Sequence, residues 1–134
     1  MGTIVVGYVP KPEGKAALRR AAEEARLRGA RLIVINSHRG GREFDNDDAI
    51  ESEAQLEEVR SELRDAGVEH EVRQLVRGMD PAEDLINVAQ EVGADLIVIG
   101  LRRRSPVGKL ILGSNAQRIL LDAPCPVLAV KGAE

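Results

Sequence analysis

Five short runs of aliphatic residues recur along the 134-residue chain and limit its possible folds more than any other feature. Val, Ile and Leu dominate these runs, and successive runs are separated by segments long enough to form helices. We expect strands over residues 3–9, 31–36, 71–76, 95–100 and 126–131. Nearly continuous aliphatic runs are typical of strands buried on both faces, as in a parallel sheet. The run at 71–76 alternates more with polar residues, which favours a position at the edge of the sheet.

The segments between these runs have the apolar periodicity of amphipathic helices. We expect helices over residues 14–29, 46–66, 81–93 and 114–122. The expected core face of the second helix consists of Ile50, Ala54, Leu56, Val59 and Leu63. Each of the first three helices is expected to end at a glycine, because glycine readily adopts the left-handed conformation that closes a helix. These glycines are Gly29, Gly67 and Gly93.

The last two helices begin with residues typical of capping boxes. Asp80 and Ser114 each precede a helical pattern, and Glu83 and Gln117 follow them three residues later. In a capping box the two side chains satisfy backbone N–H groups of the first helical turn. Pro81 suits the first helical position, where no hydrogen-bond donor is needed. We therefore expect Asp80 and Ser114 to be the N-caps.

The alternation of strands and helices predicts the fold class. Strands that alternate with helical crossovers form a parallel sheet covered by helices on both faces. We expect one α/β domain over residues 1–134, a three-layer sandwich with a five-stranded sheet. In such sheets, ligands bind beyond the carboxyl ends of the strands where the winding direction reverses. The connections after the first, second and fourth strands are therefore the places to search for a site.

Composition excludes several classes of function. One Tyr, one Phe and no Trp leave no stacking platform for single-stranded nucleic acid, and the net charge of −3 gives no overall basic surface. Nucleic-acid binding is therefore not expected. The lone Cys125 allows no disulfide framework. No signal peptide or membrane-spanning run is evident, so we expect a cytoplasmic protein that is not bound to a membrane.

The connection from Gly100 to Gln117 is the strongest candidate for a binding site. Gly100 ends a buried strand and permits close backbone approach, while Gly113 and Ser114 open a helix whose N-terminus favours an anion. Arg102–Arg104 lie between them. Three interpretations are open: a phosphate-binding loop, a basic interaction patch, or a solvated connection.

Other sites are less consistent with the residues present. A Walker A loop is excluded, because Gly108–Lys109 is followed by Leu110 and no glycine stands five residues before Gly108. No Rossmann glycine fingerprint, Ser/His/Asp arrangement or metal-binding pattern is evident. We therefore expect no catalytic or metal-ligating residues, and at most slow hydrolysis of ATP.

Three segments resemble the universal stress protein family. "KAALRRAAEEARLRGARLIVIN" is similar to its first helix and second strand, and "GMDPAEDLINVAQEVGADLIVIG" to its third crossover and fourth strand. "LGSNAQRILLDAPCPVLAVK" closely resembles its C-terminal signature. The resemblance covers nearly the whole chain, from Thr3 to Lys131. It implies the strand order 3-2-1-4-5 and a fold like that of the adenine-nucleotide alpha hydrolases.

The resemblance also implies a nucleotide site. The family motif has Gly, two residues, Gly, nine residues, Gly, then Ser or Thr; Gly100, Gly113 and Ser114 match it, but Arg103 replaces the middle glycine. Members that bind nucleotide usually carry Asp after the first strand, where this chain has Val9. The expected ligand is ATP or AMP. Its contacts would come from Gly7, Tyr8, Val9, Ser37, Gly100, Arg103, Gly113, Ser114 and Asn115.

Two functions follow from the resemblance. The first is a stress-response module that binds an adenine nucleotide, with a partly degenerate motif. The second is a dimeric protein-interaction module of the same fold that binds no nucleotide. Members of the family commonly form homodimers, and the expected interface is the last strand, 126–131, whose free edge could pair with its twin.

Overall fold

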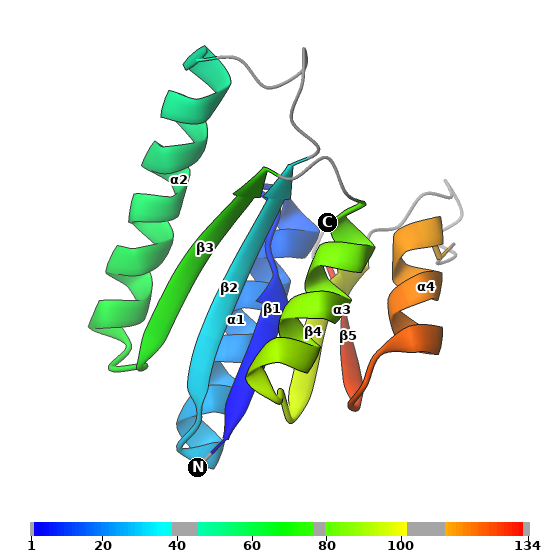
Figure 1. Ribbon diagram of the computed structural model, residues 1–134. Helices are drawn as coiled ribbons and strands as arrows, with labels where there is room; N and C mark the ends of the chain where they lie inside the picture. Colours follow the sequence, from blue (N-terminus) through cyan, green and yellow to red (C-terminus); the bar gives the residue numbers. More distant parts are fainter. Residues whose placement is uncertain (1, 39–45, 77–79, 102–111, 133–134) are drawn as a thin grey trace.

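The computed structural model describes residues 2–38, 46–76, 80–101 and 112–132. Strands and helices alternate along these residues as predicted (Figure 1). The elements are β1 (Thr3–Gly7), α1 (Pro12–Arg28), β2 (Arg31–His38), α2 (Asn46–Asp65), β3 (His70–Val76), α3 (Pro81–Val92), β4 (Leu96–Leu101), α4 (Ser114–Asp122) and β5 (Val127–Lys131). The first strand ends at Gly7 rather than at Val9. The first helix begins two residues earlier than predicted, because Pro12 suits its first turn.

The five strands form one parallel sheet in the order β3-β2-β1-β4-β5. This confirms the predicted fold class and the edge position of β3. The chain winds from β1 outward to β3, and then crosses over to β4 and β5 on the other side of β1. The winding direction therefore reverses between β1 and β4, which places the expected binding crevice at the carboxyl ends of these two strands.

Helices cover both faces of the sheet, so that both faces of the central strands are buried. Figure 1 shows α3 in front of the sheet and α1 behind it. Ile4 and Val6 of β1 pack in a cluster with residues of α1 and α2, while Val5 packs in a second cluster with residues of α3 and α4. Successive strand residues point to opposite faces. This two-sided burial is the reason that the central strands consist almost entirely of aliphatic residues.

The predicted core face of α2 is wrong in its N-terminal part. Ile50 is 70% exposed and Ala54 is also exposed, whereas Leu56, Val59 and Leu63 are buried as predicted. The N-terminal end of α2 extends beyond the carboxyl ends of β2 and β3 (Figure 1), so its first turns have no sheet to cover. Ser52, which also lies in this part of α2, is buried and hydrogen-bonded.

The helix ends agree with the sequence in most respects. Gly29, Gly67 and Gly93 have φ angles of 62°, 71° and 61°, the left-handed conformation predicted for them. Asp80 is the N-cap of α3 and Pro81 follows it, although no side chain makes a capping hydrogen bond there. The structure thus confirms the positions of these residues but not the capping box at α3.

The predicted cap of α4 is wrong by one residue. Gly113 is the N-cap, and Ser114 is already the first helical residue, with no side-chain capping bond. The Gln117 side-chain amide donates to the carbonyl oxygen of Leu112 at 3.3 Å instead of completing a capping box. Glycine is itself a good N-cap, so the chain enters the helix before the serine.

No helix within the described ranges is both long and apolar enough to cross a bilayer.

Candidate functional site

A cavity of about 190 Å³ lies at the carboxyl edge of the sheet. Its walls come from the ends of β1, β2 and β4, from the first turns of α3 and α4, and from α1. The lining residues are Gly7, Tyr8, Val9, Gly14, Ile35, Ser37, Pro81, Ala82, Leu85, Ile99, Gly100, Asn115, Ala116 and Ile119. The cavity therefore lies at the place where the winding direction of the sheet reverses.

Six of the nine predicted site residues line this cavity. They are Gly7, Tyr8, Val9, Ser37, Gly100 and Asn115. Gly113 and Ser114 directly precede Asn115 at the start of α4 but do not line the cavity themselves. Arg103 lies outside the described residues, as do Arg102 and Arg104. Six predicted residues from three separate connections are thus brought to one cavity, while Gly113 and Ser114 lie next to it.

The apolar lining was not predicted from the sequence. Ile35, Leu85, Ile99 and Ile119 are buried and contribute most of it. One signal was present: Ile35 and Ser37 are two residues apart on a strand, so their side chains share one face of the sheet. The contribution of α3 depends on how that helix packs, and no motif marks it.

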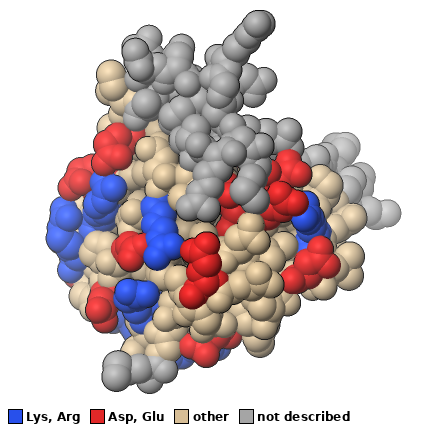
Figure 2. Space-filling view, viewed as in Figure 1, with Lys and Arg blue, Asp and Glu red and all other residues tan. Residues whose placement is uncertain are grey.

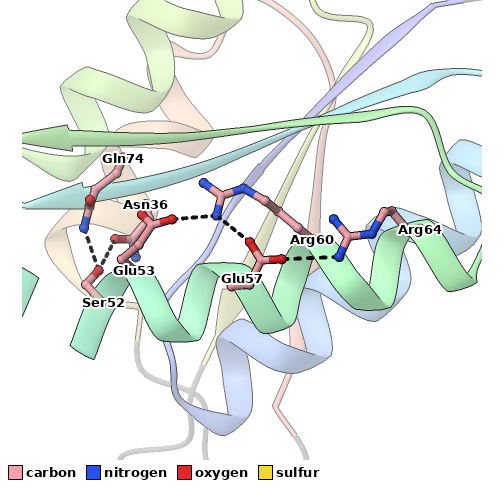
Figure 3. Close-up of polar contacts among 7 residues, drawn as sticks. All are labelled: Asn36, Ser52, Glu53, Glu57, Arg60, Arg64 and Gln74. Carbon is pink, nitrogen blue, oxygen red and sulfur yellow. Dashed lines mark hydrogen bonds and ion pairs between the residues drawn. The ribbon is translucent and has the colours of Figure 1, made fainter. Parts of the chain in front are cut away.

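The segment after β1 is held by a chain of buried amide and hydroxyl groups. Asn36 donates from its side-chain amide to the carbonyl oxygen of Tyr8 at 3.1 Å. Ser52 of α2 donates to the Asn36 amide oxygen at 3.3 Å, and Gln74 of β3 donates to Ser52 at 2.7 Å (Figure 3). Three elements therefore fix the backbone of Tyr8. Val9, which follows it, is 43% exposed.

The side chain of Tyr8 is buried on the side of α2. Burial raises the pKa of its phenol, and the nearby carboxylates of Glu62 and Glu58 raise it further. The phenol therefore stays protonated at neutral pH and adds no charge to this end of the cavity.

Two glycines bring the start of α1 against the strand ends. A β-carbon on Gly14 would lie 1.8 Å from the carbonyl oxygen of Val9, and one on Gly100 would lie 2.2 Å from that of Glu13. The close backbone approach predicted at Gly100 is therefore present, and its partner is α1. Because this packing already requires glycine at position 100, the residue is not by itself a sign of a ligand.

The N-terminus of α4 offers uncapped backbone donors. Gly113 has an extended conformation, and within the described part of the chain no side chain caps the first turn. These groups and the helix dipole favour an anion at this position. Asn115 and Ala116, in the same turn, line the cavity.

Arg118 ties α4 to α3. It donates to Glu83 at 2.8 Å and lies 3.8 Å from Asp122 and 4.0 Å from Asp80. The hydrogen bond to Glu83 and these carboxylates raise the pKa of the Arg118 guanidinium. Its charge is compensated by acidic partners, so among the described residues the donors for an anion near α4 are the backbone N–H groups of the helix.

A serine and a buried carboxylate meet between β2 and α3. Asp84, in the first turn of α3, is fully buried, and its Oδ2 accepts a hydrogen bond from the hydroxyl of Ser37. Its Oδ1 has no hydrogen-bond partner. Ser37 lines the cavity whereas Asp84 lies behind it. Ser37 was among the predicted site residues, whereas Asp84 was not.

Two glutamates of α2, Glu53 and Glu57, are paired with arginines of the same helix. Arg60 donates to Glu53 at 2.7 Å and to Glu57 at 3.3 Å, and Arg64 donates to Glu57 at 3.3 Å (Figure 3). Figure 2 shows basic and acidic side chains interspersed over this face of the molecule. Among the described residues, no group of three or more His, Cys, Asp or Glu side chains could hold a metal ion.

A second hollow lies between α1 and α2. This open groove of about 800 Å³ is lined by residues such as Leu18, Arg26 and Leu63. It is formed by the C-terminal halves of the two helices, and thus lies toward the amino ends of the strands. Ligand sites of open α/β sheets lie at the opposite edge, so the smaller cavity is the candidate site.

Known proteins of similar sequence and structure show which family the chain belongs to. Residues 1–131 match the universal stress protein family. A universal stress protein from Mycolicibacterium smegmatis is 48% identical over 128 residues, 96% of either chain. The structure of a universal stress protein from Archaeoglobus fulgidus matches with a TM-score of 0.86 and 44% identity, covering 98% of this chain and 99% of that one. Another Archaeoglobus fulgidus structure, in complex with dAMP, has a TM-score of 0.80, 38% identity and 98% coverage of both chains. The chain therefore belongs to the universal stress protein family.

Proposed function

We propose that this protein is a stress-response module that binds an adenine nucleotide, AMP or ATP, in the cavity at the carboxyl edge of the sheet. One observation carries the proposal: a single cavity joins the ends of β1, β2 and β4 to the first turn of α4. A family member that is 38% identical to this chain was solved in complex with dAMP. A cavity with an apolar lining and few polar groups is typical of small-molecule sites.

The distribution of polar and apolar groups in the cavity favours one orientation of the nucleotide. Its phosphate would bind at Gly113, Ser114 and Asn115, where the helix N-terminus supplies donors for an anion. Its base would lie over the backbone of Gly7–Val9 and beside Ser37, against the apolar side chains of the lining. The anionic phosphate would thus lie at hydrogen-bond donors, and the base would lie against apolar side chains.

Titration calorimetry with AMP, ATP and adenosine tests this function. We expect AMP to bind about tenfold more tightly than adenosine, because only AMP places an anion at the N-terminus of α4. Replacement Ser114→Ala should weaken AMP binding about fivefold and leave adenosine binding unchanged. The exposed Ser61, on α2, provides the matched control Ser61→Ala. Absence of binding by all three ligands at millimolar concentration would refute the function.

The two departures from the family motif can be tested by restoring it. Val9 lines the cavity and offers only backbone hydrogen-bonding groups to a base. Replacement Val9→Asp would add a carboxylate acceptor for an exocyclic amine, and Arg103→Gly would restore the middle glycine. If these departures weaken the site, both variants should bind ATP more tightly than the native protein. Unchanged affinity in both would show that the departures have no effect on binding.

We also propose a second function, a dimeric interaction module located in the cytoplasm. The supporting observation is that β5 is an edge strand whose residues Val127–Val130 are only half-buried in the single chain. Pairing of two such edges would cover them. Sedimentation of the native protein and of Leu128→Lys tests this idea. A dimer that the lysine dissociates is expected, and a native monomer would refute the interface. Fractionation of cells tests the location.

A further inference from the structure

The contact between Ser37 and Asp84 has a consequence for ligand selection. Ser37 comes from the end of β2 and lines the cavity, while Asp84 comes from α3 and is sealed behind it. The serine hydroxyl has one hydrogen, and the carboxylate accepts it. The Ser37 oxygen therefore has only lone pairs left for a ligand.

A fully buried carboxylate needs an explanation. Burial of a charged group is unfavourable unless its hydrogen bonds are satisfied, and Oδ1 of Asp84 has no partner. The neighbouring residues of α3, Ala82, Leu85 and Val88, are buried and apolar. A leucine at position 84 would suit this environment better. A carboxylate whose one hydrogen bond fixes a group in the cavity is consistent with a role in binding.

The position of Ser37 suits contact with the base. β1 separates β2 from β4, so Ser37 lies across the sheet from Gly100 by two strand spacings, about 10 Å. With its phosphate at the N-terminus of α4, a nucleotide in the cavity would extend its base toward Ser37 at the end of β2. Ile35 and Leu85 would contact the faces of the ring, and Ser37 would meet its edge.

We propose that the pair of Ser37 and Asp84 selects purines that carry an amino group at position 6 over those that carry an oxo group. This inference rests on the proposed nucleotide function. Ser37 is the specificity-determining residue, since its oxygen accepts a hydrogen bond from the 6-amino group. Asp84 is a positioning residue, because it keeps the serine hydrogen away from the ligand. A 6-oxo group at the same place would bring two acceptors together, which leaves both unsatisfied.

Titrations with AMP and IMP test the proposal, because these ligands differ at position 6 of the purine and at the adjacent ring nitrogen. We expect the native protein to bind AMP about tenfold more tightly than IMP. Ser37→Ala removes the acceptor, and the preference should fall below about twofold. Asp84→Leu frees the hydroxyl to donate or accept, so the preference should fall similarly. The double variant should show no further change, because both residues act through one hydrogen bond.

The outcomes separate this inference from the proposed function. Equal binding of AMP and IMP by the native protein would overturn the selection and leave the nucleotide function intact. Failure of both ligands to bind would overturn both. A preference that Ser37→Ala abolishes but a folded Asp84→Leu retains would overturn the role of Asp84. Ser61→Ala should keep the native preference, and Ser37→Ala tests the proposal alone if Asp84→Leu does not fold.

Discussion

Gly100 of β4 lies against the first turn of α1 so closely that a β-carbon in its place would stand 2.2 Å from the carbonyl oxygen of Glu13. This relationship joins the end of a central strand to α1, which covers the opposite face of the sheet from α3. It also determines which substitutions the carboxyl edge of the sheet can accept.

Replacement Gly100→Ala should destabilise the protein by about 2 kcal/mol, because the backbone of α1 must move to admit the methyl group. Urea unfolding followed by circular dichroism measures this change. Gly7→Ala is the matched control, because its β-carbon would meet the flexible side chain of Leu85 at 3.3 Å. It should therefore lower the free energy of unfolding by less than Gly100→Ala does. Equal losses would show that the contact with Glu13 does not decide the effect.

Removal of the Asn36 side chain should also destabilise the fold. Asn36→Ala leaves the Tyr8 carbonyl and the Ser52 hydroxyl without this partner in a buried place. We expect a loss of about 2 kcal/mol in the free energy of unfolding. Gln90→Ala removes an exposed amide from α3 and should change stability by less than about 0.5 kcal/mol. A similarly small effect of Asn36→Ala would contradict a structural role for this network.

Replacement of Asp84, in contrast to that of Asn36, should not destabilise the fold. Replacement of a buried charged group by an apolar side chain of similar shape is often neutral or stabilising by about 1 kcal/mol or more. We therefore expect Asp84→Leu to melt at the same temperature as the native protein or a higher one. A large decrease, with the Ser37→Ala variant unchanged, would mean that the carboxylate is retained for stability rather than for ligand selection.

Cys125 provides a prediction that depends on pH. Burial raises the pKa of its thiol, and the nearby Asp95 raises it further. Only the thiolate reacts with a disulfide reagent, so at pH 8.5 the folded protein should react more slowly than the same protein in urea. The folded state binds the proton more tightly, and stability should therefore fall as the pH rises above about 8.5. Equal reaction rates in both states would contradict this prediction.

The fold could be predicted because its determinants are local. Aliphatic runs such as Leu32–Ile35 mark strands buried on both faces, and Gly29, Gly67 and Gly93 mark helix ends by their conformation. Ile50 was assigned to the core wrongly, because periodicity cannot tell how far a helix extends beyond its sheet. Ser114 was assigned to the cap wrongly, because the preceding glycine caps equally well.

The site could be predicted only in part. Strand ends indicated the three connections and Gly100, and the family resemblance implied Gly7 and Ser37 within them; the carboxyl ends of neighbouring parallel strands do meet in space. Asp84 lies 47 residues from Ser37, and their contact depends on the packing of α3 against β2. A lone aspartate in a helical pattern is ordinarily a surface residue, so its burial could not be read from the sequence.

The pairing of β1 with β4 has a consequence for synthesis of the chain. β1 lies at the centre of the sheet, and its Ile4 pairs with Leu96, which the ribosome adds more than ninety residues later. Until then one edge of β1 has no neighbour and its aliphatic side chains are incompletely covered. Non-local parallel pairs form slowly, and open strand edges promote aggregation. The nascent chain is thus most vulnerable just before β4 leaves the ribosome, and the cavity at the carboxyl edge of the sheet cannot exist before that moment.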